Sequence, residues 1–522
     1  MKILFLARHY TYFRNFESVL RELARRGHVL HLAVERGETL GGTAMVEALA
    51  AESPSITYGE LPARTADEWS WVVQRLRLGL DHLRYQHPVF DAAWKLRERS
   101  RERTPGAFVR IGSMARALGG FSRRLVTRVL CAMERAVPED PAISQYLDSQ
   151  RPDLLLLTPL VDLGSSQIEY LRAARAVRVP TGLCVWSWDH LSSKALIREA
   201  PDRVFVWNAT QKQEAITLHD VPADRVVVTG AQCFDWWFDR QPSRDGETFR
   251  SEAGLASSPY LLWVCSALIH GSAPEAPFVQ KWIETLRRSG SSRLRTIPIL
   301  VRPHPSRQAE WEGVDLSGLN AVVWGGNPID ARSRADYFDS LYYSAAVVGI
   351  NTSAFIEAAI LGRPVYTLLV PETADNQTGT VHFNYLLNAG GGLLEVARSF
   401  DEHIAQLDAA LATAARPDIR PFVREFVRPH GLDVAATSRF VNAVESMEAL
   451  TVAPPHGDPL AGVWRWAAQR AARMQDDERY ERWTLSSREL ASLERLRGAR
   501  RRKALRRAEA RRAHNIDTPG TR

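Results

Sequence analysis

The stretch from 345 to 370 places three small polar residues and one acid between two apolar runs. Asn351, Thr352 and Ser353 follow an apolar run that predicts a buried strand, and Glu357 is the only charged residue between 354 and 361. A helix that begins here presents free backbone N–H groups and its positive dipole end, which suit a phosphate. Glu357 comes one turn after Ser353 on the same helix face. Its carboxylate can accept hydrogen bonds from vicinal sugar hydroxyls, so the pattern predicts a site for a nucleoside diphosphate.

The same residues also fit ordinary helix capping. Asn, Thr and Ser are preferred at helix starts, and an acid near the start gains from the dipole. Two features favour the binding interpretation. The tripeptide Gly362-Arg363-Pro364 ends the helix sharply, and polar residues follow other predicted strands in this half of the chain.

Strand and helix patterns alternate along most of the chain, which predicts parallel βαβ units. A polar segment with Pro and Gly at 230–259 divides them, so we expect a first domain at 1–230 and a second at 259–450. A helical insertion at 64–135 interrupts the first domain, and 451–522 form a basic helical tail. The predicted strands are 2–6, 28–34, 153–157, 181–185, 203–207 and 225–229, then 260–265, 297–302, 320–324, 345–350 and 364–370.

Composition excludes several classes of protein. Hydrophobic residues make up 45% and charged residues 24% of the 522 residues, as in soluble globular proteins. No apolar run approaches the roughly 20 residues that span a bilayer, and the first apolar run is too short for a signal peptide. We therefore expect a cytoplasmic protein. The four cysteines include no Cys-x-x-Cys pair, which argues against a zinc site or a disulfide framework.

The net charge of +7 is unevenly distributed. Residues 95–128 and 488–512 each carry a net charge of +8, and subtracting both leaves the rest of the chain acidic. The charge is therefore no argument for nucleic-acid binding by the body, and we expect no specific nucleic-acid partner. The second segment is interpreted as a solvated basic arm.

Residues 95–128 mix arginines with apolar side chains such as Phe108, Met114, Leu118 and Phe121. This mixture suits an anionic membrane surface, where each nearby Arg contributes about 1 kcal/mol. One expectation is peripheral contact with the inner face of a membrane, where a lipid-linked acceptor would lie. Solvated helices that pack on the domain fit the pattern equally well.

Three segments resemble the GT-B glycosyltransferases, and the resemblance covers about 1–450 without the insertion. The segment GINTSAFIEAAILGRPV resembles their nucleotide-sugar motif, in which a small-residue turn precedes Glu-Ala-x-x-x-Gly-x-Pro. VFVWNATQKQEAITLHDVPADRVVVTGAQCFD resembles the end of their N-terminal domain, and ILVRPHP resembles a strand that brings His-Pro to the cleft. Surface-carbohydrate enzymes are the most similar group. Lipid-A-disaccharide synthases, nucleotide-sugar 2-epimerases and glycerophosphotransferases are related groups.

The resemblance implies an α/β fold of two Rossmann-like parallel-sheet domains that face each other across a cleft. It also implies that Arg302 and His304, which alternate at a strand end, act as cations that neutralise a departing diphosphate. The resemblance implies that the diphosphate is contacted by Ser266, Ala267, Arg302, His304, Thr352 and Ser353. It implies base contacts from Trp324, Gly325 and Gly326, and a ribose contact from Glu357. Contacts to the donor sugar would come from Glu372, Asp375, Gln377 or His382.

An inverting reaction needs a base in the first domain to take the proton of the acceptor hydroxyl. Asp189 follows the predicted strand 181–185, and His9 follows 2–6. We expect Asp189 as the base, with His9 second. Many GT-B enzymes have a glycine-rich turn where this chain has His9-Tyr10-Thr11-Tyr12, so acceptor contacts do not carry over. A retaining mechanism without an enzyme base stays open.

The sequence thus predicts a glycosyltransferase that moves a sugar from a nucleotide-diphosphate donor to a hydroxyl of a glycan or lipid-linked acceptor, in cell-surface glycan biosynthesis. No Asp-x-Asp motif ends a predicted strand, so we expect no metal and no cofactor apart from the donor. Two alternatives stay open. One is a 2-epimerase or glycerophosphotransferase on the same scaffold, and the other is a non-catalytic scaffold that binds nucleotide or glycan.

Overall fold

The computed structural model describes residues 1–37, 41–62, 64–65, 67–255, 259–413, 417–452, 457–474 and 477–499. These residues belong to two compact units. The two-sheet unit comprises Met1–Thr65, Pro88–Leu96 and Glu139–Gly457. The helical unit comprises Ala66–His87, Arg97–Pro138 and the described residues between 458 and 499.

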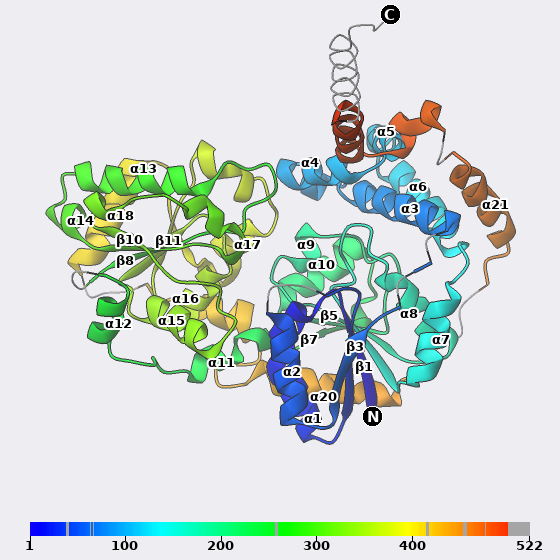
Figure 1. Ribbon diagram of the computed structural model, residues 1–522, viewed down its shortest axis with the longest axis horizontal. Coiled ribbons are helices and arrows are strands. Elements are labelled where there is room, and N and C mark those ends of the chain that lie inside the picture. Colours follow the sequence, from blue (N-terminus) through cyan, green and yellow to red (C-terminus); the bar gives the residue numbers. More distant parts are fainter. Residues whose placement is uncertain are drawn as a thin grey trace, which may run out of the picture. The chain divides into compact units, whose positions relative to one another are not determined.

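The first sheet of the two-sheet unit is wholly parallel and has seven strands (Figure 1). Its order, β3-β2-β1-β4-β5-β6-β7, reverses direction between β1 and β4. The central strands are buried on both faces, which explains their continuous apolar sequences. The strands are β1 (Lys2–Ala7), β2 (Val29–Val34), β3 (Ile56–Glu60), β4 (Leu154–Thr158), β5 (Thr181–Cys184), β6 (Arg203–Val206) and β7 (Val226–Val228).

The second sheet is also parallel, with six strands in the order β10-β9-β8-β11-β12-β13. Its direction reverses between β8 and β11. The predicted α/β class with two parallel sheets is therefore confirmed. The strands are β8 (Leu261–Val264), β9 (Ile299–Arg302), β10 (Ala321–Val323), β11 (Ala346–Gly349), β12 (Val365–Leu368) and β13 (Leu394–Ala397).

Helices cover both faces of each sheet. On the first sheet, α1, α2 and α20 pack on one face, and α7, α8 and α10 on the other. On the second, α13, α14 and α18 pack opposite α12, α15 and α16 (Figure 1). The helices are α1 (Glu17–Arg25), α2 (Gly42–Glu52), α7 (Pro141–Gln150), α8 (Gln167–Ala176), α9 (His190–Ser193), α10 (Ala209–His219), α11 (Asp235–Asp239), α12 (Gly246–Glu252), α13 (Glu275–Arg288), α14 (Ser292–Thr296), α15 (Ala331–Tyr342), α16 (Ala354–Ile360), α17 (Phe383–Asn388), α18 (Phe400–Ala412), α19 (Arg420–Phe422) and α20 (Ala436–Glu445).

The helix α20 belongs to the first sheet, although we placed 259–450 in the second domain. Phe440, Val441 and Val444 of α20 join the core that contains Phe5 of β1. The carboxylate of Asp235, at the start of α11, accepts hydrogen bonds from the backbone N–H of Ala436 (3.1 Å) and Thr437 (2.7 Å). It also forms an ion pair of 2.9 Å with Arg428. The buried acid Asp235 thus connects two segments: the one that leads from the first sheet to the second, and the one that leads back to α20.

The helical unit combines the predicted insertion with the start of the predicted tail. Leu76 and Leu80 of α3 pack with Ala468 and Ala472 of α21. Inside this unit, Arg77 donates to Glu134 over 2.9 Å, and both side chains are buried. The tail from 500 onward lies outside the described residues. The helices are α3 (Glu68–Arg84), α4 (Trp94–Arg103, which starts in the two-sheet unit), α5 (Gly106–Ala117), α6 (Gly120–Arg135), α21 (Ala461–Ala472) and α22 (Glu481–Thr484).

Among the described residues, none of the helices combines the length and the apolar character that crossing a bilayer requires.

We predict that Asp235→Asn lowers the free energy of unfolding by about 3 kcal/mol, because it leaves the buried Arg428 without its partner. Urea denaturation followed by circular dichroism measures the change. Asp239→Asn, at an exposed position of the same helix, is the control and should stay within about 0.5 kcal/mol of the parent. Equal stability of the two variants would contradict the role given to Asp235.

Candidate functional site

The predicted site residues lie at the carboxyl ends of the strands. His9 follows β1, Asp189 follows β5, and Ser266 follows β8. Ligands of open parallel sheets bind at these ends, where the strand order reverses.

Arg302, at the end of β9, lies among aromatic rings. Its guanidinium carbon is 5.4 Å from the ring centre of Trp324 and 5.1 Å from that of Tyr337. It donates long hydrogen bonds of 3.4 Å to the carbonyls of Asp336 and Gly326. Burial lowers its pKa, but an Arg at this depth keeps its charge. The result is a fixed cation whose hydrogen-bonding capacity is not used up by short contacts.

Gly325 makes this placement of Arg302 available. Its φ is +100°, a conformation that L side chains rarely adopt, and a Cβ atom here would overlap the Arg302 guanidinium. The neighbouring Gly326 has no atom within 4 Å of such a Cβ position. Glycine is therefore required at the first of these two positions only.

Glu357, on α16, accepts a hydrogen bond from the hydroxyl of Tyr337. Burial raises the pKa of its carboxyl to about 7, while the Tyr337 bond and the charge of Arg14 act in the opposite direction. Arg14 comes from η1 (Tyr10–Phe16), directly after β1 of the first sheet. Glu357, which we predicted to bind the ribose, thus lies within electrostatic range of Arg14 from the first sheet.

His304 is the N-cap of η5 (Pro305–Trp311). Its Nδ1 accepts the backbone N–H of Ser306 at 3.2 Å, which assigns the proton of the neutral ring to Nε2. Burial, with smaller effects from Arg307 and Arg14, lowers its pKa to about 4. The ring is therefore neutral at pH 7 in the free protein. We expected a cation here, and the structure instead presents a neutral donor.

Thr352 and Ser353 form the turn between β11 and α16. The Thr352 hydroxyl accepts a long hydrogen bond of 3.4 Å from the N–H of Ala354, and Ser353 is exposed. Their predicted contact with a phosphate stays a prediction. Because α16 has only seven residues, its dipole is a weak argument for an anion, and the nearby cations carry more weight.

Ser266 and His382 meet around Asn351. The Ser266 hydroxyl accepts the N–H of Asn351 at 3.1 Å, and the backbone N–H of Ser266 donates to Glu275 at 2.7 Å. The Asn351 side chain donates to Nε2 of His382 at 3.3 Å. Ser266 is buried and its backbone N–H is already used, so only its hydroxyl proton can serve a ligand.

Asp189 lies near His382, although the two residues come from different sheets. The hydroxyls of Ser187 (2.6 Å) and Ser193 (2.7 Å) donate to its carboxylate, and Lys194 is 3.3 Å away. Burial favours protonation, but Lys194, His382 and these hydroxyls outweigh it and hold the pKa of Asp189 well below its usual range. A carboxylate in this state accepts a proton poorly.

His9 packs on the ring of Tyr12, with the ring centres 4.5 Å apart, and Tyr12 contacts Trp186 edge to face at 5.1 Å. Asp189 raises the pKa of Tyr12, although burial is the larger cause, so both predicted bases lie around this ring. His190, which follows Asp189 in the chain, has a structural position: it is buried, and its Nε2 is 2.8 Å from the carbonyl of Pro159.

The remaining donor-sugar candidates separate into different environments. Gln377 is fully buried and donates to the carbonyl of Ile350 (3.1 Å) and the hydroxyl of Thr367 (2.9 Å), which is a structural role. Glu372 is paired with Lys281 at 3.0 Å, and Asp375 with Lys95 at 3.1 Å. His382, by contrast, contacts Asn351 and influences the pKa of Asp189.

Five side chains of these groups have one feature in common. Each retains solvent-accessible surface, yet desolvation by surrounding protein is the largest influence on its pKa. Arg14 and Tyr337 were missed at the sequence level, because no motif marks them. The five are Arg14, Asp189, His304, Tyr337 and Glu357.

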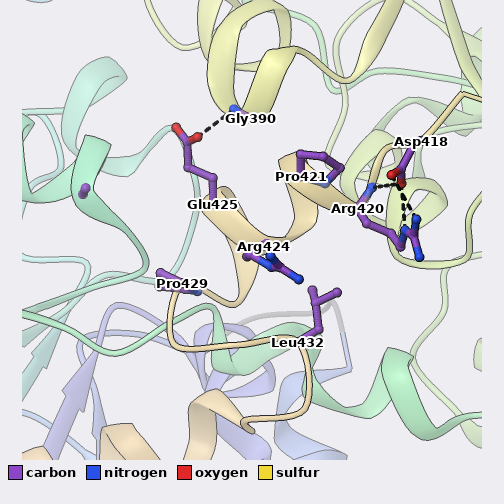
Figure 2. Close-up of a pocket in the computed structure, with 9 residues that line it drawn as sticks. Gly390, Asp418, Arg420, Pro421, Arg424, Glu425, Pro429 and Leu432 are labelled. Carbon is purple, nitrogen blue, oxygen red and sulfur yellow. Dashed lines mark hydrogen bonds and ion pairs between the residues drawn. The ribbon is translucent and has the colours of Figure 1, made fainter.

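Another concavity of the two-sheet unit, about 620 Å³ in volume, contains none of the predicted site residues (Figure 2). Its acids are already engaged: Glu425 accepts the N–H of Gly390 at 2.9 Å, and Asp418 pairs with Arg420 at 2.8 Å. Among the described residues, no group of three or more His, Cys, Asp or Glu side chains could hold a metal ion. The expected independence from metal stays a prediction.

We predict that Gly325→Ala lowers the free energy of unfolding by about 2 kcal/mol, because it strains a positive φ and displaces Arg302. Urea denaturation measures this loss, and calorimetry should show weaker nucleoside diphosphate binding. Gly326→Ala is the matched control for stability and should leave the free energy of unfolding unchanged. If the two variants behave alike, the packing of Gly325 against Arg302 is not needed.

Comparison with known proteins gives structural matches. No protein-family model and no curated protein matches the sequence. A glycosyltransferase from Rickettsia africae superimposes with a TM-score of 0.50, at 9% identity over 86% of this chain and 99% of its own. The UDP-GlcNAc 2-epimerase of Neisseria meningitidis bound to UDP-GlcNAc gives a TM-score of 0.49 at 12% identity, over 85% and 100%. Anabaena HepE in complex with UDP and glucose gives 0.47 at 11%, over 85% and 100%.

At these identities the likeness concerns the fold and does not extend to activity. The two parallel sheets, each with helices on both faces, agree with the fold of the Rickettsia enzyme. The chain therefore has the GT-B fold.

Proposed function

We propose that the protein is a glycosyltransferase that moves a sugar from a nucleotide-diphosphate donor to a hydroxyl acceptor in cell-surface glycan biosynthesis. The observation that carries the proposal is that His304 and Glu357 of the second sheet both lie within electrostatic range of Arg14 of the first. The guanidinium carbon of Arg302 is 5.1 Å from the ring centre of Tyr337, whose hydroxyl donates to Glu357. Cations, a neutral N–H donor and a carboxylate are the groups that a diphosphate and a ribose require.

The chemistry follows from the charge that develops as the donor breaks. The anomeric C–O bond cleaves, and its electron pair leaves with the nucleoside diphosphate while the acceptor oxygen bonds to the sugar. Arg302 is held by aromatic rings, and its long hydrogen bonds leave donor capacity for the leaving group, so its charge is fixed in place before the reaction. Nε2–H of His304 adds a donor without adding a charge.

Removal of the acceptor proton is assigned to the first sheet. The depressed pKa of Asp189 suits it better for orienting Lys194 and His382 than for taking a proton. His9, beside Tyr12, is then the preferred base in an inverting reaction. This reverses the order of the two candidates that the sequence suggested.

Incubation of the full chain with nucleotide sugars, with and without membrane-extracted acceptors, tests the proposal. We expect donor consumption that depends on acceptor. Conversion of the donor alone to its 2-epimer would identify an epimerase. Tight nucleotide binding without turnover under every acceptor would instead identify a binding scaffold.

The pKa of Glu357 predicts a pH dependence of donor binding. The ionised carboxylate accepts ribose hydrogen bonds more strongly than the neutral carboxyl does, and its pKa in the folded protein is about 7. Affinity for a nucleotide sugar, whose diphosphate keeps its charge over this range, should therefore rise between about pH 6 and pH 8, by at most about tenfold. Calorimetric titration measures this rise.

Glu357→Gln is the control, because it keeps the shape of the side chain without titrating. It should bind more weakly at high pH and show a flat profile. A parent profile that is already flat, or that falls with pH, would contradict the assignment of Glu357 to the ribose.

A further inference from the structure

The hairpin of α5 and α6 in the helical unit exposes large apolar side chains. Leu118 and Phe121, on either side of the turn between the helices, are 71% and 81% exposed. Met114 lies one turn before Leu118, and Leu125 one turn after Phe121, with exposures of 64% and 51%. We call these four residues the apolar tip. Side chains of this size are seldom so exposed in a cluster unless the surface has a partner.

The apolar tip is not a face that the unit buries elsewhere. The buried residues of α5 are Gly112 and Ala115, and those of α6 are Leu130, Ala132 and Glu134. The buried residues of α6 all lie in its second half, while Phe121 and Leu125 in its first two turns are exposed. Packing within the helical unit therefore does not account for the tip.

The charge around the tip has one sign. Between 103 and 133 the chain contains six arginines and no acid. Arg124 and Arg128 are exposed on α6, and Arg110 on α5 stacks on Trp483 with its guanidinium carbon 4.0 Å from the ring centre. An acidic surface would complement the positive charge of this hairpin.

We propose that the apolar tip inserts into the head-group region of an anionic phospholipid bilayer, with the surrounding arginines on the lipid phosphates. Burial in the boundary between head groups and acyl chains stabilises leucine, methionine and phenylalanine side chains. Anionic head groups attract the arginine side chains electrostatically. A nucleic acid would satisfy the arginines but leave the aliphatic side chains in water. A second copy of this chain would bring six arginines against six. The bilayer is the partner that satisfies both features.

Flotation of the full chain with vesicles tests the proposal. Vesicles of phosphatidylcholine with and without phosphatidylglycerol are the probes. The protein should float with the anionic vesicles and stay behind with the neutral ones. In Leu118→Ser/Phe121→Ser and in Arg124→Glu/Arg128→Glu, the partition coefficient should fall at least about tenfold. Both variants change exposed side chains, and circular dichroism checks that they remain folded.

Val177→Ser removes an apolar side chain that is 51% exposed in the two-sheet unit, and it is the matched control that should bind like the parent. Three results would overturn the proposal: no flotation of the parent, parent-like binding in both double variants, or equal binding to neutral vesicles. A dimer in light scattering that Leu118→Ser/Phe121→Ser abolishes, without vesicle binding, would identify a second copy as the partner. None of these results depends on catalysis, so the proposed function is tested separately.

Discussion

The carboxylate of Asp235 is the interaction on which the arrangement of the two sheets depends. It lies where the chain leaves the first sheet, and it binds Arg428, Ala436 and Thr437, where the chain returns. Because the acid is buried, its attraction for Arg428 is little weakened by water. The helix α20 then packs beside β1. The carboxyl ends of the two sheets, which carry the candidate groups, are held in one unit by this return.

This arrangement accounts for the electrostatics of the candidate groups. Arg14 comes from the first sheet, and it opposes the rise in the pKa of Glu357 while helping to lower that of His304. His382 of the second sheet likewise helps to keep Asp189 ionised. Each sheet therefore contributes to the pKa values of groups on the other. A separated domain would lose these influences, together with the combination of charges that fits a diphosphate beside a ribose.

Much of the fold could be predicted from the sequence, because central parallel strands are continuous apolar runs. The two strands that we missed, β3 and β13, are the edges of their sheets and carry exposed residues, which weakens the apolar signal. The destination of α20 was missed as well, since an amphipathic helix does not specify the sheet on which it packs. We also did not predict that the insertion packs with the tail, because this packing depends on contacts between residues far apart in sequence, such as Leu80 and Ala468.

Some residues of the candidate site could likewise be predicted from local sequence motifs, whereas others are brought to the site only by the fold. Motif residues such as Arg302 and Glu357 could be found because they follow strands in a recognisable pattern. Arg14 and Tyr337 have no motif, and only the folded chain places them beside Glu357. The protonation states also escaped prediction. His304 was expected to be charged, but burial and neighbouring arginines keep it neutral, and Asp189 is a weaker base than its position suggested.

A crystal structure of the full chain soaked with a nucleoside diphosphate tests the central claim most directly. The account predicts phosphate oxygens within hydrogen-bonding distance of Arg302 and of the Thr352–Ser353 turn, with ribose hydroxyls on the carboxylate of Glu357. Nucleotide density confined to another concavity, such as the one beside Arg420, with Glu357 still bound only to Tyr337, would contradict it.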